Sequence, residues 1–542
     1  MGTLLQDLRF ALRNLRRTPA FPLAAIGTLA LGIGATTALF STVNAVLLRP
    51  LPYPHPEDLY ALRTTLTDGR VTTGLLAGSE LYRLNDPNLS IVRAVGLQQQ
   101  DVTLMRDDGT PLKTRVYAVS EGFFELFGLP MTLGGFTPEQ FKANGPPVVV
   151  ISTGIWKDLF NSDPAIVGKP IRFAEFSTSI AGVAPPAFDT PHGANFWINQ
   201  RLNPQDVGHG LDGYMRLKPG TSIDRARSEM AGVMAGLARD FPASAKSRAY
   251  VVRPLVESIV GDLGPILLVV LSATGLLLIL SCVNVTNLLL ARGAARAREM
   301  AVRVALGAGR RRIVRQLLTE SVVLATAGAV LGLLVAYLGV QLLLRIGAAK
   351  LPRLESVPFD GYVLVFALVA LVVSGLLVGF APALRLARTD VKTLMNESGR
   401  SAAGGGPGTT RWLNVMTVAQ IALAITLVAG AGWLIRGFAS LRAIDPGFVA
   451  QQRLLFDVSM QGPKYRDNQV AIATMTDFLG RLRAMPGVTG AGGTSSFPLR
   501  GNLEASLFVV PRGEALDPNN PKQSRQRIVT PGFFEAMGSK IV

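Results

Sequence analysis

Residues 264–290 read GPILLVVLSATGLLLILSCVNVTNLLL, a run of 27 residues without a charged side chain. At about 1.5 Å per residue such a helix is about 40 Å long, and a membrane span needs about 20 predominantly apolar residues. We therefore predict a transmembrane helix here. Four more runs are long enough to span a membrane, and Glu320 is the only charged residue inside them: 21–48, 317–344, 362–384 and 412–435.

The composition of the whole chain agrees with a membrane protein. The 542 residues are 49% hydrophobic, with a mean hydropathy of +0.33 and a formal net charge of +17. The single cysteine, Cys282, lies inside an apolar run, so we expect it to pack rather than to form a disulfide. The three histidines, His55, His192 and His209, are far apart in sequence and form no metal-ligand pattern. We expect this chain to bind neither a metal nor a cofactor.

The basic residues predict the orientation. Lys and Arg gather in residues 1–20, 291–316 and 385–411, and the second of these loops has eight arginines against one acid, Glu299. Short cytoplasmic loops carry such an excess, so we place all three regions and the N-terminus inside. Residues 49–263 and 436–542 then lie outside. This distribution accounts for most of the positive charge and argues against a nucleic-acid partner.

The N-terminal end leaves one alternative open. The first apolar run is too long for the core of a signal peptide, so we interpret it as an uncleaved anchor. Before it, Leu4, Leu8, Leu12 and Leu15 recur at helical spacing. Residues 1–20 are either an amphipathic helix on the inner leaflet or a simple basic flank.

The first outer segment, residues 49–263, predicts an α+β domain. Buried strands are expected at 148–151, 170–173, 177–183 and 213–217, and a capping box at Thr221 and Asp224 predicts a helix that runs to about Arg239. The segment has no phosphate-binding loop, no G-x-S-x-G and no H-E-x-x-H. We therefore expect a binding or force-transmitting domain rather than an enzyme.

A short motif occurs twice. Residues 119–128 read VSEGFFELFG and residues 529–538 read VTPGFFEAMG, each in an outer segment that follows a span. We interpret this as a tandem duplication in which the second unit begins near Trp412 and residues 436–542 are the start of a second outer domain. On this interpretation the chain is a fragment or a truncated product, and a longer protein would carry three more spans. The Gly-rich residues 397–410 predict a flexible inner linker.

The inner loop 291–316 predicts a short amphipathic helix. Arg296, Arg303 and Arg310 recur every seven residues, and Glu299 lies four residues before Arg303, a favourable pair on a helix. Such a helix can lie on the anionic leaflet or dock on a soluble partner and pass motion into the spans.

A resemblance favours docking. Residues 297–308 (AREMAVRVALGA) and 312–321 (RIVRQLLTES) resemble the coupling region of MacB/FtsX-like ABC transporter permeases, and residues 8–50, 148–186 and 281–292 are similar to other parts of that family, in particular its tandem-duplicated acidobacterial subgroup. The resemblance implies a MacB-type periplasmic core domain, a bacterial inner-membrane location and a separate cytoplasmic ATPase, since the chain has no G-x-x-x-x-G-K-[ST]. The residues it implies for contact with the ATPase are Arg296, Glu299, Met300, Arg303, Val304, Leu306, Gly307 and Arg310.

Small and polar residues predict contacts between the spans. Gly328 with Gly332 and Gly375 with Gly379 are G-x-x-x-G pairs, and Ala30, Gly34 and Ala38 form a stripe of small residues. Asn284 and Asn287 lie near the inner end of their span and are expected to bond across helices, with a polar gate as the alternative.

The sequence favours the permease subunit of an ABC transporter. ATP hydrolysis on a partner would move the periplasmic domain, for export or extraction of a hydrophobic or peptide-like substrate. The alternative is an FtsX-like regulator that controls a periplasmic partner without transport, and a nonfunctional fragment also stays open. The sequence does not choose a substrate, a periplasmic or outer-membrane partner, or between a homodimer and a pseudo-dimer.

Overall fold

The computed structural model divides into two compact units, which are described separately: residues 1–50 with 259–443, and residues 51–258 with 444–542. The residues that the structure describes are 13, 19–66, 74–106, 109–188, 190, 193–261, 263–295, 310–347, 360–388, 407–449, 451–458, 460, 463–465, 467–497, 506–508, 523–525 and 527–539.

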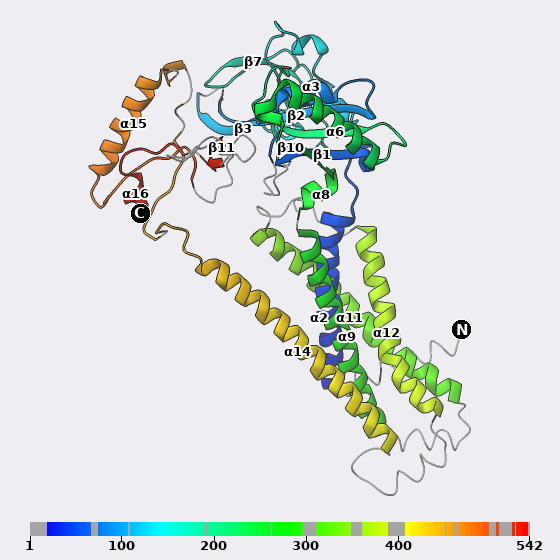
Figure 1. Ribbon diagram of the computed structural model, residues 1–542. Coiled ribbons are helices and arrows are strands. Elements are labelled where there is room, and N and C mark those ends of the chain that lie inside the picture. Colours follow the sequence, from blue (N-terminus) through cyan, green and yellow to red (C-terminus); the bar gives the residue numbers. More distant parts are fainter. Residues whose placement is uncertain are drawn as a thin grey trace. The chain divides into compact units, whose positions relative to one another are not determined.

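The membrane unit consists of long apolar helices (Figure 1). Five of them are long and apolar enough to cross a membrane, with candidate spans at Ala20–Leu48, Leu263–Leu290, Leu318–Arg345, Gly361–Gly379 and Asn414–Ala443. The helices that contain these spans are α2 (Ala20–Val43, continued by the π-turn η1, Asn44–Leu48), α9 (Leu263–Ala295), α11 (Arg310–Gly347), α12 (Gly361–Arg388) and α14 (Pro407–Ala443).

Helix α14 begins earlier than the sequence predicted. Residues 407–410, which we assigned to the flexible linker, are helical, and the helix starts at Pro407. Proline is well placed in the first turn, because its fixed φ suits a helix and its missing N–H has no intrahelical acceptor there. The remaining linker residues, and all of residues 1–20 except 13, 19 and 20, lie outside the described part.

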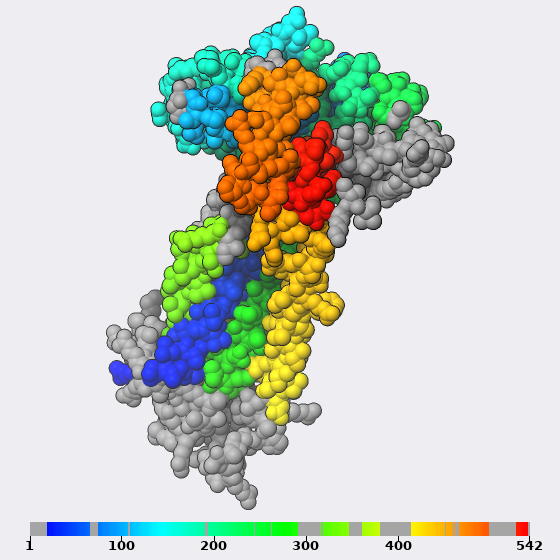
Figure 2. Space-filling model, turned by 90° about the vertical axis from the view of Figure 1, so that its left-hand side faces the viewer, coloured from blue at the N-terminus to red at the C-terminus, as the bar shows by residue number. Residues whose placement is uncertain are grey.

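Helix α2 lies at the centre of the membrane unit and contacts α9, α11 and α12. Ala25, Leu29 and Ile33 of α2 are fully buried and share one apolar cluster with Cys282 and Leu324. Cys282 is buried and free, as expected for a packing residue. Helix α14 contacts α9, and Figure 2 shows α2 (blue), α9 (green) and α14 (yellow) side by side.

The first outer domain is built on a mixed ten-stranded sheet. Its strands follow the order β10-β1-β9-β2-β3-β8-β5-β7-β4, with β6 paired to β7, and the pairs β3–β8 and β5–β7 are parallel. The strands are β1 (Leu59–Leu66), β2 (Ile91–Met105), β3 (Pro111–Val119), β4 (Leu133–Gly134), β5 (Val148–Ile151), β6 (Pro170–Arg172), β7 (Ser177–Val183), β8 (Phe196–Asn199), β9 (Asp212–Leu217) and β10 (Arg248–Pro254).

Two large apolar clusters fill this domain, and a smaller one packs Met234 and Leu237 against Ala245. One lies where helices α3 (Gly78–Leu84) and α6 (Ile223–Asp240) cover the sheet, with Leu81 and Met230 packed against Leu62 of β1. The other joins β5, β7 and β8 to α5 (Thr153–Phe160). The remaining elements are α4 (Phe123–Phe127), α7 (Pro242–Ala245), α8 (Leu255–Val260), η2 (Pro56–Asp58) and η3 (Pro138–Phe141).

The predicted cap of α6 was placed one residue too early. The N-cap is Ser222, whose hydroxyl accepts a hydrogen bond from the backbone N–H of Arg225 at 3.3 Å. The N–H of Thr221 instead donates to the carbonyl of Lys218 and closes the preceding turn. Because the turn takes up Thr221, the next hydroxyl along the chain caps the helix.

Strands β1 and β10 connect the domain to the membrane helices along the chain. Strand β1 follows α2 after a short segment, and β10 leads through α8 into α9. The two strands pair antiparallel from Tyr60 opposite Pro254 to Leu66 opposite Arg248. Their membrane-connected ends are therefore neighbours in the sheet.

The second outer segment repeats local geometry of the first. It contains η4 (Pro463–Tyr465), α15 (Asn468–Arg483), β11 (Ser506–Phe508), β12 (Gln523–Arg525) and α16 (Phe533–Met537). Helices α4 and α16 each follow a glycine in the left-handed conformation and end before another one. Around α4 the φ angle is +79° at Gly122 and +72° at Gly128, and around α16 it is +83° at Gly532 and +68° at Gly538. Glycine adopts these angles without the steric cost of a Cβ.

The same hydrogen-bond ring precedes both helices. The N–H of Gly96 donates to the Ser120 hydroxyl at 2.9 Å, and the N–H of Ser120 donates to the Gly96 carbonyl at 2.9 Å. Gly493 and Thr530 make the equivalent bonds at 2.8 and 2.9 Å. Ser120 and Thr530 occupy the same position in the repeated motif, so the likeness extends from sequence to structure.

Candidate functional site: span contacts and the juxtamembrane junction

The predicted ATPase-coupling residues fall almost entirely outside the described part of the chain. Arg296, Glu299, Met300, Arg303, Val304, Leu306 and Gly307 lie in the gap 296–309. Helix α9 ends at Ala295 and α11 begins at Arg310, whose backbone alone is described. The gap therefore joins two helices that both contact α2.

The structure brings the first G-x-x-x-G pair against the small residues of α2. A Cβ at Gly332 would lie 3.2 Å from the Ala30 carbonyl oxygen and 3.2 Å from the Gly34 nitrogen. A Cβ at Gly34 would lie 2.8 Å from the Gly332 carbonyl oxygen, and one at Gly328 would lie 2.7 Å from Leu29 Cβ. The backbones of α2 and α11 thus approach closely because neither has a side chain at these positions.

The second pair lies between α12 and α11. A Cβ at Gly379 would lie 2.8 Å from Leu318 Cδ2 and 3.2 Å from Ser321 Oγ, whereas one at Gly375 would make ordinary contact with Ala325 at 3.6 Å. Helix α11 is therefore packed tightly by glycines on two sides, against α2 and α12. A displacement of α11 would have to move at least one of these neighbours, since close-packed interfaces deform little.

Asn284 and Asn287 of α9 bond to one residue of α14. Gln420 Nε2 donates to Asn284 Oδ1 at 2.9 Å, and Asn287 Nδ2 donates to Gln420 Oε1 at 3.2 Å. The three amides thus join α9 to α14. Gln420 was not singled out in the sequence, because a lone glutamine in an apolar run has no periodic signal.

A junction forms where the chain from α2 enters the outer domain. Arg216 of β9 donates three hydrogen bonds to backbone carbonyls: Nε to Leu126 at 2.7 Å, NH1 to His55 at 3.1 Å and NH2 to Pro54 at 3.0 Å. One side chain therefore links the segment after α2 to the C-terminal turn of α4. Partial burial lowers the pKa of Arg216 and the nearby Asp58 and Glu57 carboxylates oppose that shift; the guanidinium stays charged at neutral pH, because its ordinary pKa is above 12.

Aromatic rings surround the same junction. Tyr53, in the segment that follows α2, packs on Phe127 with ring centroids 4.8 Å apart, and its hydroxyl hydrogen-bonds the Thr190 hydroxyl. Phe127 in turn meets Phe188 at 5.3 Å, edge to face. The two phenylalanines of the repeated Gly-Phe-Phe-Glu motif, Phe123 and Phe124, belong to this group and are buried. Each well-placed aromatic pair contributes about 0.5–1.5 kcal/mol beyond its buried area.

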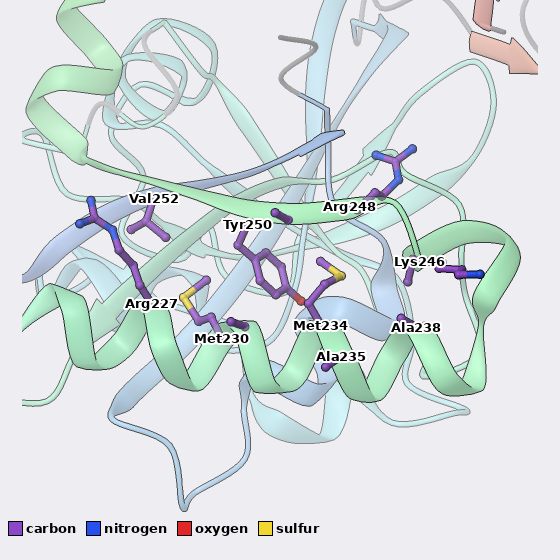
Figure 3. A pocket seen from close by; sticks show the side chains of 12 residues that line it. Arg227, Met230, Met234, Ala235, Ala238, Lys246, Arg248, Tyr250 and Val252 are labelled. Carbon is purple, nitrogen blue, oxygen red and sulfur yellow. The ribbon is translucent and has the colours of Figure 1, made fainter. Parts of the chain in front are cut away.

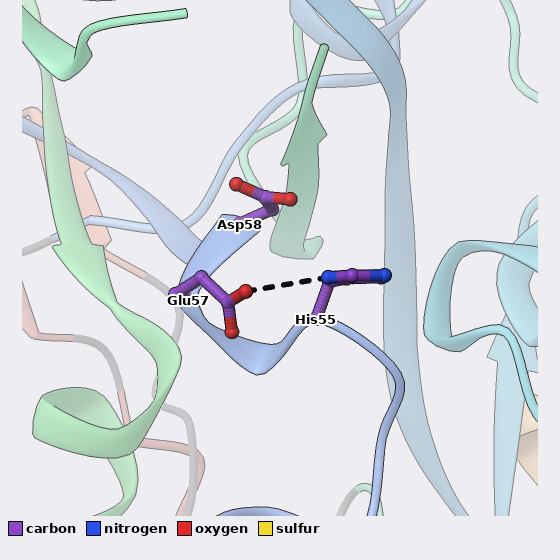
Figure 4. A group of neighbouring side chains, drawn as sticks. All are labelled: His55, Glu57 and Asp58. Carbon is purple, nitrogen blue, oxygen red and sulfur yellow. Dashed lines mark hydrogen bonds and ion pairs between the residues drawn. The ribbon is translucent and has the colours of Figure 1, made fainter. Parts of the chain in front are cut away.

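Three side chains of the junction loop could meet at a cation. His55, Glu57 and Asp58 have ligand atoms within 4.8 Å of one another, and His55 Nδ1 lies 3.3 Å from Glu57 Oε1 (Figure 4). His55 and Glu57 are exposed, and hydrogen bonding at the Glu57 backbone lowers the pKa of its carboxyl group. Exposed imidazole and carboxylate groups are hydrogen-bonded by solvent and do not need a metal ion, so we assign no metal site here.

Family comparisons place two known domains on the chain. Residues 23–233 match the MacB-like periplasmic core domain, and residues 271–391 match the FtsX-like permease C-terminal domain. Together the two matches cover most of α2, the first outer domain as far as residue 233 in α6, most of α9, and all of α11 and α12.

Relatives with known names carry both ATP-binding and permease parts. A pyoverdine export ATP-binding/permease protein, PvdT, of Pseudomonas syringae pv. tomato is 34% identical over 119 residues, which are 22% of this chain and 17% of the relative. A macrolide export ATP-binding/permease protein, MacB, of Hahella chejuensis is 23% identical over 376 residues, which are 68% of this chain and 54% of the relative. The chain thus spans between about a sixth and about half of the length of such relatives.

Among solved structures, the periplasmic region of MacB from Actinobacillus actinomycetemcomitans is 12% identical, with a TM-score of 0.29, and covers 41% of this chain and 95% of that one. The extracellular domain of the noncanonic ABC-type transporter YknZ is 15% identical, with a TM-score of 0.28, and covers 36% and 99%. From its two matched domains and its relatives, the chain is a multi-pass membrane protein that carries a MacB-like periplasmic core domain and an FtsX-like permease domain and is related to the permeases of MacB/FtsX-like ABC transporters.

Proposed function

We propose that the chain is the permease subunit of an ABC transporter whose ATPase is a separate cytoplasmic protein. The observation that carries the proposal is the order of the two matched domains, with the arginine-rich loop 291–316 inside the FtsX-like region. ATP would bind on the partner, and the N-terminus and this loop would face the cytoplasm. The chain itself would catalyse no reaction.

The packing supports a route for motion. The coupling residues 296–310 lead directly into α11, which packs through Gly328 and Gly332 on α2. Helix α2 continues into residues 51–58, which Arg216 and Tyr53 bind to α4 of the outer domain. A push on the inner loop would reach the outer domain through one tight helix contact and one short covalent connection.

The repeated geometry supports a duplicated architecture. Gly122 and Gly532, Ser120 and Thr530, and the two short helices α4 and α16 have the same roles in the two outer segments. Two units in one chain would form a pseudo-dimer with two outer domains. In that arrangement the bonds between Gln420 and the asparagines of α9 would join the two halves.

The substrate would be hydrophobic or peptide-like, handled on the outer side of the membrane. The relatives are named for export of pyoverdine and of macrolides, which are organic molecules of that general kind. An FtsX-like regulatory role remains the second candidate, favoured by the FtsX-like match itself. Export of a compound in cells would separate the two functions.

The test is capture of the ATPase from native membranes. A tagged chain should co-purify with an ATP-binding-cassette ATPase, and Glu299→Lys or Arg303→Glu should reduce that yield at least tenfold because both reverse a charge in the predicted docking helix. Glu121→Lys is the control, since it makes the same charge change at an exposed position of the outer domain. Equal capture by Glu299→Lys and wild type would overturn the assignment of the coupling segment, and the absence of any such ATPase from the wild-type sample would overturn the function.

A further inference from the structure

A cavity of about 300 Å³ lies in the outer domain between α6 and β10 (Figure 3). That volume is at the lower end of the range for small-molecule sites, and equals on the order of ten water molecules. Its lining comes from one face of α6, the turn at α7 and β10: Arg227, Met230, Ala231, Met234, Ala235, Ala238, Ala245, Lys246, Arg248, Ala249, Tyr250 and Val252.

The walls are apolar and adaptable. Met230, Met234 and Val252 are buried, and methionine side chains fit irregular apolar ligands because they are unbranched and polarisable. The helix side is open because Ala231 and Ala235 are exposed alanines where larger side chains would close the cavity. An alkyl chain can therefore lie against α6 without displacing any part of the backbone.

The charged side chains that line the cavity are basic, and the acids Asp224 and Glu80 interact with two of them. Among the described residues that line it, three are basic and none is acidic. Arg227 is paired with Asp224 at 3.1 Å, and Arg248 is held by bonds to the Ser244 carbonyl and the Thr64 hydroxyl. Lys246 is exposed and has no ion-pair partner within the described ranges, so it is the cation free to meet an anion.

The ring of Tyr250 forms part of the same wall. The Tyr250 ring extends from β10 towards α6, between Met230 and Met234 (Figure 3). Its oxygen is buried and has no hydrogen-bond partner in the described structure. Burial raises the pKa of Tyr250 well above its ordinary value, so the phenol keeps its proton and remains a donor at neutral pH. Because this oxygen is shielded, the part of Tyr250 that faces the cavity is its apolar ring.

From the cavity, its apolar walls and the exposed Lys246 at its edge, we propose that the cleft between α6 and β10 binds a single-chain anionic amphiphile of the fatty-acid class. The carboxylate lies beside Lys246, and the alkyl chain lies along Met230, Met234 and the Tyr250 ring. Strand β10 leads through α8 into α9, so the ligand would sit on the strand that connects directly to a membrane helix. The proposal does not depend on transport, because binding needs neither ATP nor an ATPase.

The experiment is photo-crosslinking of the full chain in phosphatidylcholine nanodiscs with a dodecanoate that carries a terminal diazirine, followed by peptide mapping. We expect adducts on the α6 and β10 peptides, suppressed by excess dodecanoate but not by dodecanol. Ala235→Leu should reduce these adducts at least tenfold by filling the cavity, and Lys246→Glu should reduce them about tenfold or more by reversing the head-group contact.

The matched control is Ser228→Leu, which adds the same side chain at an exposed position of α6 that does not line the cavity. It should leave the labelling unchanged. Adducts confined to the membrane helices, equal labelling of Ala235→Leu and wild type, or equal competition by dodecanol would each overturn the proposal. Lys246→Glu keeps the test valid if Ala235→Leu fails to fold, since Lys246 is exposed and its replacement changes no packing.

Discussion

Replacing Arg216 by methionine should loosen the juxtamembrane junction. Methionine retains much of the unbranched aliphatic part of the side chain but removes all three donors to the Leu126, His55 and Pro54 carbonyls. The segment after α2 would then be held to the outer domain mainly by Tyr53 and its aromatic contacts. The route from the membrane helices to the outer domain would lose its polar link.

The magnitude follows from the environment of each bond. A hydrogen bond to a charged group contributes about 1.5–3 kcal/mol, and the partly buried bond to Leu126 falls in that range. The bonds to His55 and Pro54 are exposed, so each contributes about 0.5–1 kcal/mol. The sum is about 2.5–5 kcal/mol, which corresponds to an increase in local opening of about seventyfold to several thousandfold.

Amide hydrogen exchange of the full chain in nanodiscs measures this opening. The reporters are the amides of Leu126 and Gly128, which donate to the carbonyl of Gly122 just before α4 and to those of Phe124 and Glu125 within it. Arg172→Met is the control, because Arg172 is an exposed arginine of β6 away from the junction. Exchange at these two amides within threefold of wild type in Arg216→Met would refute the reasoning.

Three further predictions follow from the packing and the charges. Gly332→Leu should force α2 and α11 apart and so lower the free energy of unfolding by about 1–3 kcal/mol, measured from the thermal unfolding midpoint. Gly275→Leu is the control and should change the midpoint little, because the space around the Gly275 Cβ position is open. Gln420→Leu should weaken the α9–α14 contact by about 0.6–1.2 kcal/mol and increase cleavage of α14 in limited proteolysis, while Thr426→Val, whose hydroxyl bonds only within α14, should not. Hydrogen bonds from the backbone N–H and the hydroxyl of Ser90 lower the pKa of the Glu229 carboxyl group in the folded protein. Ionised Glu229 therefore stabilises the fold above its ordinary pKa of about 4.3, and this stabilisation is lost as the pH falls through the lowered pKa of the folded protein. Glu229→Gln should flatten the fall in the free energy of unfolding between about pH 6 and pH 3, and an unchanged pH dependence in that range would contradict this.

The parts of the fold that depend on local pattern could be predicted from the sequence. The five apolar helices follow from run length alone, and the strands at 148–151 and 177–183 follow from buried β-branched runs. The extension of α14 to Pro407 was missed because glycine-rich composition outweighed the helix-starting preference of the proline. The cap at Ser222 was missed because both Thr221 and Ser222 can cap, and only the preceding turn decides between them.

Long-range polar contacts could not be predicted. Arg216 reaches carbonyls that are 90 to 162 residues away, and carbonyl groups leave no mark in a sequence. Gln420 and Asn284 are 136 residues apart, so their pairing depends on how the spans pack. The coupling residues 296–307 stay a prediction, because they lie outside the described part of the chain.

The central claim is that ATP hydrolysis on a partner changes the outer domain through the junction at residues 51–58. The most direct test is hydrogen exchange of that segment in the full chain mixed with its ATPase, compared between ATP and ADP. We predict that exchange at 51–58 differs between the two nucleotides in the wild type and becomes equal in Glu299→Lys. Identical exchange in both nucleotide states while the bound ATPase hydrolyses ATP would contradict the account.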